Sequence, residues 1–347
     1  MMNEEQHQND LLTQPALLAD VLRRMGLSDG AAAPEVEILT GGVSSSIFRV
    51  DIGHASYCIK QALPKLKVEK DWWAPVSRVF SEIDWLRAAH EIVPGHVPRI
   101  LGADQACGAF AMEFLPESDY ANWKAALLRG TVDSGVAAQV GDILGTIHQA
   151  TACDAALAGR FATGANFFAL RLEPYLVEAA RQHPDLSVEL IALIHQTQNH
   201  PLVLVHGDVS PKNILVGKNG PVLLDAECAW YGDPAFDLAF VLNHLLLKAA
   251  HLSAHASEFF NAFESLLAAY SAQVRWEPVD KLLARTARLL PGLLLARVDG
   301  KSPVEYLEED AREQVRRFAR EALRDPSSTL AGLLGRWKSC IAGGDVA

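Results

Sequence analysis

The stretch from Leu202 to Asp237, LVLVHGDVSPKNILVGKNGPVLLDAECAWYGDPAFD, constrains this chain more than any other part of its sequence. An apolar run, Leu202 to Val205, leads through a histidine and a glycine to Asp208. A second apolar run, Pro221 to Leu224, ends at two further acids, and the Gly-Lys-Asn-Gly segment at 217–220 predicts a hairpin turn between the runs. One hairpin would then hold four side chains around a single point: Asp208, Asn213, Asp225 and Glu227.

These side chains are of the types that metal-assisted phosphoryl transfer uses. Asp208 can accept, or simply orient, the proton of an attacking hydroxyl group. Asn213 offers a neutral oxygen to a magnesium ion, and Asp225 offers a carboxylate that bridges metals. Glu227 comes two residues after Asp225 and therefore points to the same side of an extended chain. Hard oxygen ligands of this kind favour Mg²⁺.

Two other residues of the stretch have a structural role in this interpretation. His206 comes just before the catalytic loop and Asp237 lies behind it, so we expect both to hold the loop by hydrogen bonds. Taken singly, each polar residue of the stretch is compatible with a solvated turn. The ordered combination with a strand lysine and a helix glutamate, described below, argues against that reading of the whole set.

The composition of the whole chain limits its partners and its compartment. With 347 residues, half of them hydrophobic, the chain can form two domains or one large bilobal unit. A net charge of −11 argues against nucleic acid as the main partner. The sequence predicts neither a membrane helix nor a signal peptide. Because its five cysteines lack metal-type spacing, we expect free thiols and a cytoplasmic protein.

The N-terminal part predicts one helix followed by a small antiparallel sheet. Apolar residues recur at helical spacing over 17–25. Short apolar runs predict about five strands, at 36–38, 47–52, 57–62, 97–101 and 109–115. The glycine- and serine-rich segment after the first strand can fold over phosphates, with its backbone N–H groups and hydroxyls facing the oxygens. The residues concerned are Gly41, Gly42, Ser44 and Ser45. An ordinary hairpin turn is at least as good a reading of this segment.

Lys60 lies inside the third of these runs, YCIKQA. It is either an edge-strand lysine that faces solvent or a buried lysine, which needs a partner because an unpaired buried ammonium is costly. In the second reading it grips the α- and β-phosphates of a nucleotide and pairs with a glutamate on the next helix. The apolar stripe over 79–86 places Glu82 beside the packed face of that helix. Glu91 is the runner-up, although it lies past the predicted helix end.

The chain leaves the sheet at MEFLP, where we place a hinge. Residues 1–114, with a preceding helix within 1–30, form the predicted nucleotide-binding lobe, and 115–347 form the catalytic and substrate-binding lobe. Backbone groups of Glu113 and Leu115 can hydrogen-bond an adenine edge, although a plain connector would look the same. The charged and aromatic segment 65–73 predicts a loop near the cleft.

Beyond this hinge the periodicity is helical, with helices predicted over 238–250, 257–274, 279–298 and 305–323. His148 ends an apolar stripe, and we expect it to be a packed helix residue rather than a ligand. Arg171 lies amid apolar residues, where it can line a substrate pocket or form a structural ion pair. Arg297 begins a second segment, 297–306, that we expect beside the substrate.

HGDVSPKNIL and LLDAECAWYGDPAFDLA resemble the catalytic loop and the metal segment of the aminoglycoside phosphotransferase-like kinases. The resemblance covers roughly Gly41 to Tyr306 and its catalytic motifs are specific. It implies a protein-kinase-like fold and ATP- and Mg²⁺-dependent phosphorylation of small-molecule hydroxyls. It also carries the base onto Asp208, metal ligands onto Asn213 and Asp225, and a structural role onto Asp237. Protein kinases are disfavoured, because HGD replaces HRD and DAE replaces DFG.

Within that family, the chain looks most like the 5-methylthioribose kinases, because D-x-E is followed by an aromatic residue, a tyrosine and a glycine. In those kinases the glutamate, here Glu227, binds the metal together with the aspartate. Those kinases grip their sugar with paired arginines. The pairs in this chain, Arg23-Arg24 and Arg316-Arg317, lie in unrelated contexts, and Arg297 is single. The methylthioribose activity is therefore left as an alternative.

Together these features predict an α+β, bilobal protein-kinase-like fold, with a small antiparallel-sheet lobe that carries one key helix and a larger, mainly helical lobe. They predict an enzyme that transfers the γ-phosphate of ATP to a hydroxyl of an aminoglycoside-, sugar- or amino-alcohol-like molecule. The alternative from another class is a nucleotide-binding pseudokinase that acts as an interaction module, which would normally lack a base or a metal ligand. A P-loop kinase is excluded because GxxxxGK[ST] does not occur.

Overall fold

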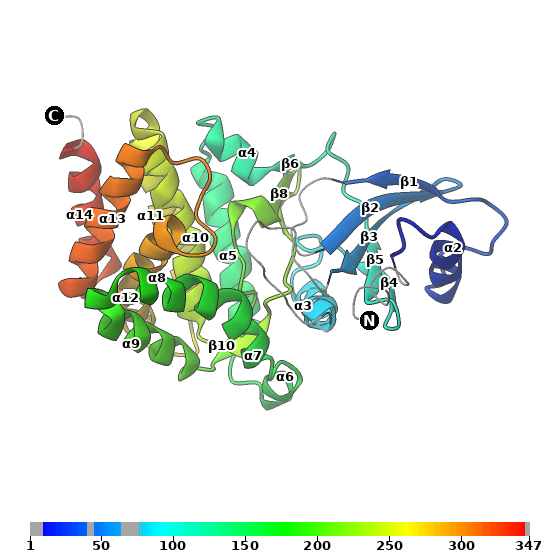
Figure 1. Cartoon of the computed structure of the whole chain (residues 1–347), viewed down its shortest axis with the longest axis horizontal. Helices are drawn as coiled ribbons and strands as arrows, with labels where there is room; N and C mark the ends of the chain where they lie inside the picture. Colours follow the sequence, from blue (N-terminus) through cyan, green and yellow to red (C-terminus); the bar gives the residue numbers. More distant parts are fainter. Residues whose placement is uncertain (1–9, 40–44, 64–75, 77, 344–347) are drawn as a thin grey trace. The chain divides into compact units, whose positions relative to one another are not determined.

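The computed structural model describes residues 10–39, 45–63, 76 and 78–343, and the chain forms two compact units, Met1–Asp119 and Tyr120–Ala347 (Figure 1). In the residues that the structure describes, the first unit is an antiparallel sheet with two helices, and the second is mainly helical. This is the α+β class that the sequence predicts.

The sheet of the first unit has the strand order β1-β2-β3-β5-β4, and every neighbouring pair is antiparallel. Its strands are β1 (Glu35–Ile38), β2 (Ser45–Ile52), β3 (Ala55–Ala62), β4 (Ile100–Asp104) and β5 (Ala109–Glu113). The number of strands agrees with the prediction. The fourth strand, however, begins at Ile100 rather than at Val97. Because β3 lies in the middle of the sheet, its inward-facing side chains are enclosed by neighbours on both sides.

Two helices within the described ranges accompany this sheet. α2 (Pro15–Arg24) begins with a proline in its first turn and packs Leu18, Val21 and Leu22 into the core formed with the strands. α3 (Arg78–Ile92) contacts β3 and β4 and buries its apolar stripe. The prediction that Glu91 lies past the end of this helix is wrong, since α3 continues to Ile92.

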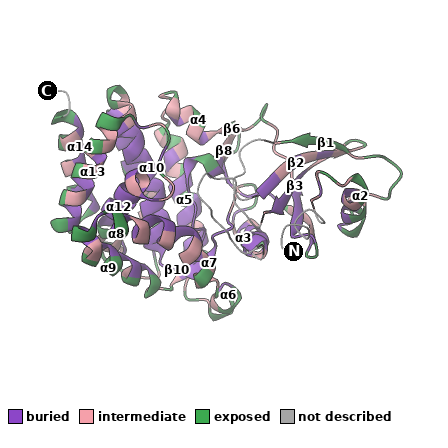
Figure 2. Cartoon of the chain, viewed as in Figure 1, coloured by how far each residue is buried: buried purple, intermediate pink, exposed green. Residues whose placement is uncertain are grey.

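The second unit is built around α10 (Pro234–His251), which is buried from Pro234 to Ala250 (Figure 2). A helix that is apolar on nearly all sides belongs in an interior. α10 packs against α11 (Ala256–Gln273), α12 (Val279–Asp299) and α13 (Glu309–Arg324). The remaining helices are α4 (Trp123–Leu128), α5 (Ser134–Thr151), α6 (Ala155–Arg160), α7 (Gly164–Phe167), α8 (Glu178–Gln182), α9 (Ser187–Gln198), α14 (Leu330–Gly343), the π-helix η1 (Phe168–Val177) and the 3₁₀ turns η2 (Pro184–Leu186), η3 (Pro211–Asn213) and η4 (Ser253–His255).

Short strands in this unit carry the central stretch of the sequence. β8 (Ile214–Gly217) and β9 (Gly220–Leu223) form the hairpin, and β6 (Ala121–Asn122) pairs with β8. β7 (Val203–Val205) pairs instead with β10 (Trp230–Gly232). The predicted turn is therefore correct, but the strand before it was assigned wrongly. Apolar runs of three or four residues do not reveal their partners.

No helix within the described ranges combines the length and the apolarity that a membrane span requires.

Candidate active site

The first unit holds a buried ion pair between its sheet and α3. Lys60 lies on β3, opposite Ile47 on one side and Phe110 on the other, so it is not an edge-strand residue. Its Nζ lies 2.8 Å from both carboxylate oxygens of Glu82, and the two side chains are 3% and 1% exposed. The predicted contact between this strand lysine and the helix glutamate is present.

Other residues that the sequence predicts at a nucleotide lie in the same unit. Ser45 is the first residue of β2 and is buried. Glu113 ends β5, where its N–H donates to the carbonyl oxygen of Arg99 at 3.0 Å and its carboxylate accepts from the Arg99 N–H at 3.0 Å. Leu115 lies two residues beyond the strand, and no described residue hydrogen-bonds its N–H. Gly41, Gly42, Ser44 and the predicted loop at 65–73 lie outside the described residues.

The catalytic loop of the second unit is held at its backbone by Asp237. Asp237 lies in the first turn of α10 and is fully buried. Its carboxylate accepts hydrogen bonds from the N–H of His206 at 2.7 Å and from the N–H of Gly207 at 2.8 Å. Gly207 has a φ of +79°, and a Cβ there would lie 2.6 Å from the carbonyl oxygen of Cys228. The loop can therefore pass this close to the neighbouring chain only with glycine at that position.

The predicted brace extends behind Asp237 to two aromatic side chains. Nε2 of His148 lies 3.2 Å from Asp237 Oδ2, and Nδ1 of His148 lies 2.8 Å from the hydroxyl of Tyr270. His148 is fully buried on α5, as expected of a packed helix residue. Through its contact with Asp237 it supports the loop from behind.

His206 links the loop to the segment after the hairpin. Its Nδ1 accepts from the N–H of Asp208 at 3.1 Å, and its Nε2 lies 3.1 Å from the carbonyl oxygen of Leu224. Burial lowers the pKa of His206. A neutral imidazole that carries its proton on Nε2 satisfies both contacts.

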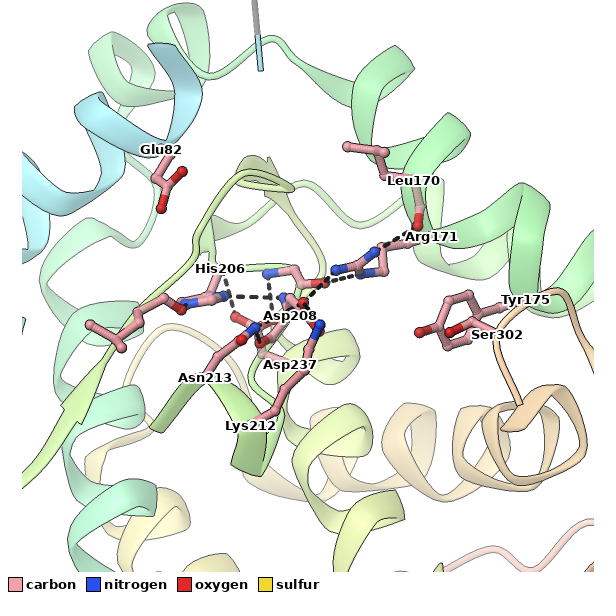
Figure 3. A network of polar contacts seen from close by, with 12 residues as sticks. Glu82, Leu170, Arg171, Tyr175, His206, Asp208, Lys212, Asn213, Asp237 and Ser302 are labelled. Carbon is pink, nitrogen blue, oxygen red and sulfur yellow. Dashed lines mark hydrogen bonds and ion pairs between the residues drawn. The ribbon is translucent and has the colours of Figure 1, made fainter. Parts of the chain in front are cut away.

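The two carboxylate oxygens of Asp208 have different surroundings (Figure 3). Oδ2 accepts from Asn213 Nδ2 at 2.8 Å, lies 2.7 Å from Nη2 of Arg171 and lies 3.4 Å from Nζ of Lys212. Within the described residues, Oδ1 has no hydrogen-bond partner. One hydrogen bond and two ion pairs therefore hold one oxygen and leave the other to accept from a further group.

Arg171 connects the π-helix η1 to the loop that carries Asp208. It lies in the π-helix η1 and is 7% exposed. Its Nε donates to the carbonyl oxygen of Gly207 at 2.7 Å, and its Nη1 donates to that of Leu170 at 2.7 Å. Burial works to lower the pKa of Arg171, but the carboxylate of Asp208 outweighs it and the pKa lies above its ordinary value. Of the two readings left open by the sequence, the ion pair is present, and its partner is Asp208.

The candidate metal ligands are Asn213, Asp225 and Glu227, which all lie in the second unit. Because Asn213 points Nδ2 at Asp208, its Oδ1 is the atom that remains for a metal. Asp225 adopts a left-handed backbone with φ of +67°, a strained conformation for a residue with a side chain. Glu227 is buried two residues later.

Within the described ranges, no three His, Cys, Asp or Glu side chains converge to hold a metal unaided. The predicted ligands Asn213, Asp225 and Glu227 carry amide and carboxylate oxygens, which are the hard donors that Mg²⁺ takes together with water and phosphate oxygens.

Arg297 lies away from Asp208 and binds a different set of groups. Its Nη1 donates to the hydroxyl of Tyr175 at 3.2 Å, to the hydroxyl of Ser302 at 3.1 Å and to the carbonyl oxygen of Ser302. The ring of Tyr175 lies 5.6 Å from the Arg297 guanidinium and 5.9 Å from that of Arg171. The two predicted substrate arginines are therefore linked through one aromatic ring.

The sequence analysis did not predict that Lys212 and Tyr175 belong to this site. Lys212 stands directly before Asn213 and one helical turn after Asp208, which is a signal for contact once η3 is recognised. The carboxylate of Asp208 raises the pKa of Lys212. No sequence pattern marks Tyr175, which depends on the packing of η1 against α10 and α12.

Comparison with known proteins agrees with this geometry. The family profile described as "Phosphotransferase enzyme family" matches residues 35–249. A methylthioribose kinase of Erwinia tasmaniensis is 29% identical over 231 residues, which cover 58% of this chain and 57% of that enzyme. The matches to two other methylthioribose kinases, of Citrobacter koseri and Pectobacterium atrosepticum, cover 64% and 62% of those enzymes. The chain thus spans less than two thirds of the length of these curated relatives.

Solved structures share the fold at low sequence identity. A putative aminoglycoside phosphotransferase from Ralstonia eutropha has a TM-score of 0.56 at 16% identity, over 88% of this chain and 96% of that one. An ethanolamine kinase of Plasmodium vivax has a TM-score of 0.55 at 12% identity, over 96% and 91%. At these identities the likeness establishes the fold alone. Because the family profile matches more than half of its length, the chain belongs to the phosphotransferase enzyme family.

Proposed function

We propose that this chain is a small-molecule kinase that transfers the γ-phosphate of ATP to a hydroxyl group of its acceptor. The observation that carries the proposal is the asymmetric carboxylate of Asp208, with Oδ2 held by one hydrogen bond and two ion pairs, and with Oδ1 open among the described residues. An acceptor hydroxyl that donates to Oδ1 is oriented for attack on phosphorus. Its new O–P bond forms as the bond from phosphorus to the ADP oxygen breaks, and its proton passes to Asp208.

Other residues of this unit keep Asp208 in position. Asp237 fixes the backbone at His206 and Gly207. Arg171 binds both the carboxylate and the carbonyl oxygen of Gly207, so it couples the rotamer of Asp208 to the loop that carries it. Positioning of this kind accounts for much of the catalysis of phosphoryl transfer, which needs little covalent help from the protein.

The cofactors belong to the same proposal. We assign Mg²⁺ to Oδ1 of Asn213 and the carboxylates of Asp225 and Glu227; when bound, it neutralises charge on the phosphate oxygens. We assign the α- and β-phosphates to Lys60, held by Glu82, because a lysine with a buried counterion keeps its charge. Further nucleotide contacts are assigned to Gly41, Gly42, Ser44, Ser45, Glu113 and Leu115. The five free cysteines support the cytoplasm as the compartment.

The acceptor class stays open between aminoglycoside-, sugar- and amino-alcohol-like hydroxyl compounds. The methylthioribose kinases among the relatives favour a sugar as the specific alternative. The interaction-module alternative is disfavoured, because the proposed base and metal ligands are all present and the relatives are named kinases.

Steady-state ADP release by the purified full chain tests the proposal, with ATP, Mg²⁺ and a panel of hydroxyl compounds. Asp208→Asn keeps the size of the side chain but removes its negative charge, and we expect turnover to fall by about 10²- to 10⁴-fold. Nucleotide binding should change little. Asp142→Asn is the matched control, since Asp142 is exposed on α5 and contacts only Gln273 among the described residues. Equal turnover in wild type and Asp208→Asn would refute the proposed role.

A further inference from the structure

A stripe of α10 connects the Asp208 site to a second group of polar side chains. Phe240, His244 and Lys248 recur at every fourth residue and therefore share one face of the helix. The Phe240 ring lies 5.9 Å from the Arg171 guanidinium, and its centroid lies 5.4 Å from that of His244. Lys248 follows Phe240 by two turns, about 12 Å along the helix.

Lys248 is the most unusual member of this stripe. It is 1% exposed, and the ring of Tyr306 lies 5.0 Å from its Nζ. In the part of the chain that the structure describes, Nζ has neither a carboxylate within ion-pair distance nor a hydrogen-bond acceptor. Burial lowers the pKa of Lys248 to about 7, and the charges of Lys124 and Arg297 act in the same direction.

The side chains around Lys248 share this lack of partners. Nε2 of His244, Nε of Arg297 and the hydroxyl of Tyr306 are buried and have no hydrogen-bond partner among the described residues. His244 is 6% exposed. Each of these atoms can donate a hydrogen bond, and a buried donor left without an acceptor is destabilising. Glu305, the nearby carboxylate, is exposed and is paired with Lys124.

We infer that the acceptor carries an oxyanion, a carboxylate or a phosphate monoester, in addition to the hydroxyl that is phosphorylated. Lys248, Arg297, Tyr306 and His244 bind this oxyanion, while the hydroxyl lies at Asp208. The inference rests on the proposed function, because it concerns the acceptor of the same reaction.

The chemistry of the four side chains supports an anion over the other acceptor classes. Oxyanion oxygens supply the acceptors that these donors lack, and a negative charge compensates Lys248 and Arg297. A cationic amine would meet two positive charges and no free carboxylate in this group. A neutral sugar can accept hydrogen bonds but leaves the charge of Lys248 uncompensated.

Bound oxyanion also changes the protonation of Lys248. A nearby negative charge favours the ammonium form, so binding at pH 8 should take up a proton. The other titratable or charged groups near this lysine are His244, His251, Lys124, Arg297, Glu305 and Tyr306. Calorimetry in Tris and in HEPES, whose ionisation enthalpies differ, measures the uptake.

The test compares neutral hydroxyl compounds with anionic compounds that have the same number of carbon atoms. Two matched sets serve as probes: glycerol, glycerate and glycerol 3-phosphate, and glucose, gluconate and glucose 6-phosphate, with choline and kanamycin added as cations. Affinity is measured by calorimetry, and phosphorylation is measured by ADP release. We expect at least one anionic member to bind about tenfold or more tightly than its neutral counterpart, with proton uptake. Comparison of the carboxylates with the phosphates identifies the oxyanion.

Lys248→Met should remove this preference and the proton uptake. Lys338→Met is the matched control, because Lys338 also lies over an aromatic ring, 5.4 Å from that of Phe260, but it is exposed and paired with Glu264. It should bind the anion as wild type does. Unchanged anion binding by Lys248→Met overturns the inference, and so does the failure of every anionic member to bind more tightly than its neutral counterpart.

These outcomes separate the inference from the proposed function. Phosphorylation of a neutral or cationic member, without a preference for anions, overturns the oxyanion site and leaves Asp208-dependent phosphotransfer standing. Anion binding that depends on Lys248, without ADP release from any member that binds, supports the site and counts against the proposed function.

Discussion

Among the residues that the structure describes, two lysines are buried, one in each unit, and their charges are compensated in different ways. Lys60 lies on a central strand with both oxygens of Glu82 at 2.8 Å. Lys248 lies on the buried helix α10, with the ring of Tyr306 at 5.0 Å. No described carboxylate lies within ion-pair distance of Lys248.

The difference indicates where each lysine obtains its countercharge. An ammonium persists in a protein interior only if a negative charge accompanies it. The protein itself supplies that charge to Lys60 through Glu82. Lys248 either loses its proton or receives the charge from a ligand. The two proposed roles, a nucleotide lysine and an acceptor lysine, thus correspond to two different kinds of partner.

Of the substitutions that test this difference, the one at Lys60 should change the free energy of unfolding most. Lys60→Met leaves the buried carboxylate of Glu82 without its ammonium, and we expect the free energy of unfolding to fall by about 3–5 kcal/mol. Urea unfolding followed by circular dichroism measures it. Lys60→Met/Glu82→Leu removes both charges and should recover most of the loss. A double variant as unstable as the single one would show that the uncompensated carboxylate is not the cause.

At Lys248 the same substitution, lysine to methionine, should change the free energy of unfolding in the opposite direction. Lys248→Met replaces a buried ammonium that lacks a carboxylate with an apolar side chain of similar length. We expect the free energy of unfolding to rise by about 1–4 kcal/mol in the absence of ligand, measured at pH 6 by urea unfolding. Lys338→Met, on the exposed side of α14, should change it by less than about 0.5 kcal/mol. Destabilisation by Lys248→Met would mean that the lysine has a structural countercharge.

The smallest change, when it is taken per pH unit, is the pH dependence that Lys248 adds to stability. Its pKa is about 7 in the folded chain and 10.5 without the protein environment, so between these values the unfolded chain binds more protons. The free energy of unfolding therefore rises with pH from about 7 to about 10.5, by at most about 1.4 kcal/mol per pH unit. The difference between wild type and Lys248→Met isolates this slope. A constant difference from pH 6 to 9.5 would contradict the lowered pKa.

Local patterns in the sequence were enough to predict the first of these lysines. A polar residue inside a short apolar strand, followed by a helix with a glutamate beside its apolar stripe, predicts the Lys60–Glu82 contact from neighbouring elements. Lys248 was not predictable in this way. A lysine in a predicted amphipathic helix is expected on the exposed face, and its burial follows from the packing of other helices around all sides of α10.

Prediction of the loop around Asp208 was limited in the same way: contacts within the motif were predicted, and contacts with distant segments were not. Its motif predicts Asp208, Asn213 and the brace at Asp237, because these residues lie close together in sequence or on the following helix. The pairing of β7 with β10 and the contact of Arg171 with Asp208 were missed or left open. Both depend on the path of the chain between distant segments, and the second also requires a π-helix that propensities do not predict.

The central claim is that Asp208 directs phosphate from ATP to an organic hydroxyl. Transfer of label from [γ-³³P]ATP tests it most directly, when wild type, Asp208→Asn and Asp142→Asn are incubated with the same neutral, anionic and cationic compounds and the products are separated. The account predicts labelled organic phosphate ester from wild type and from Asp142→Asn, and about 10²- to 10⁴-fold less from Asp208→Asn. Ester formation by Asp208→Asn at the wild-type rate, or label released only as inorganic phosphate by all three proteins, would contradict it.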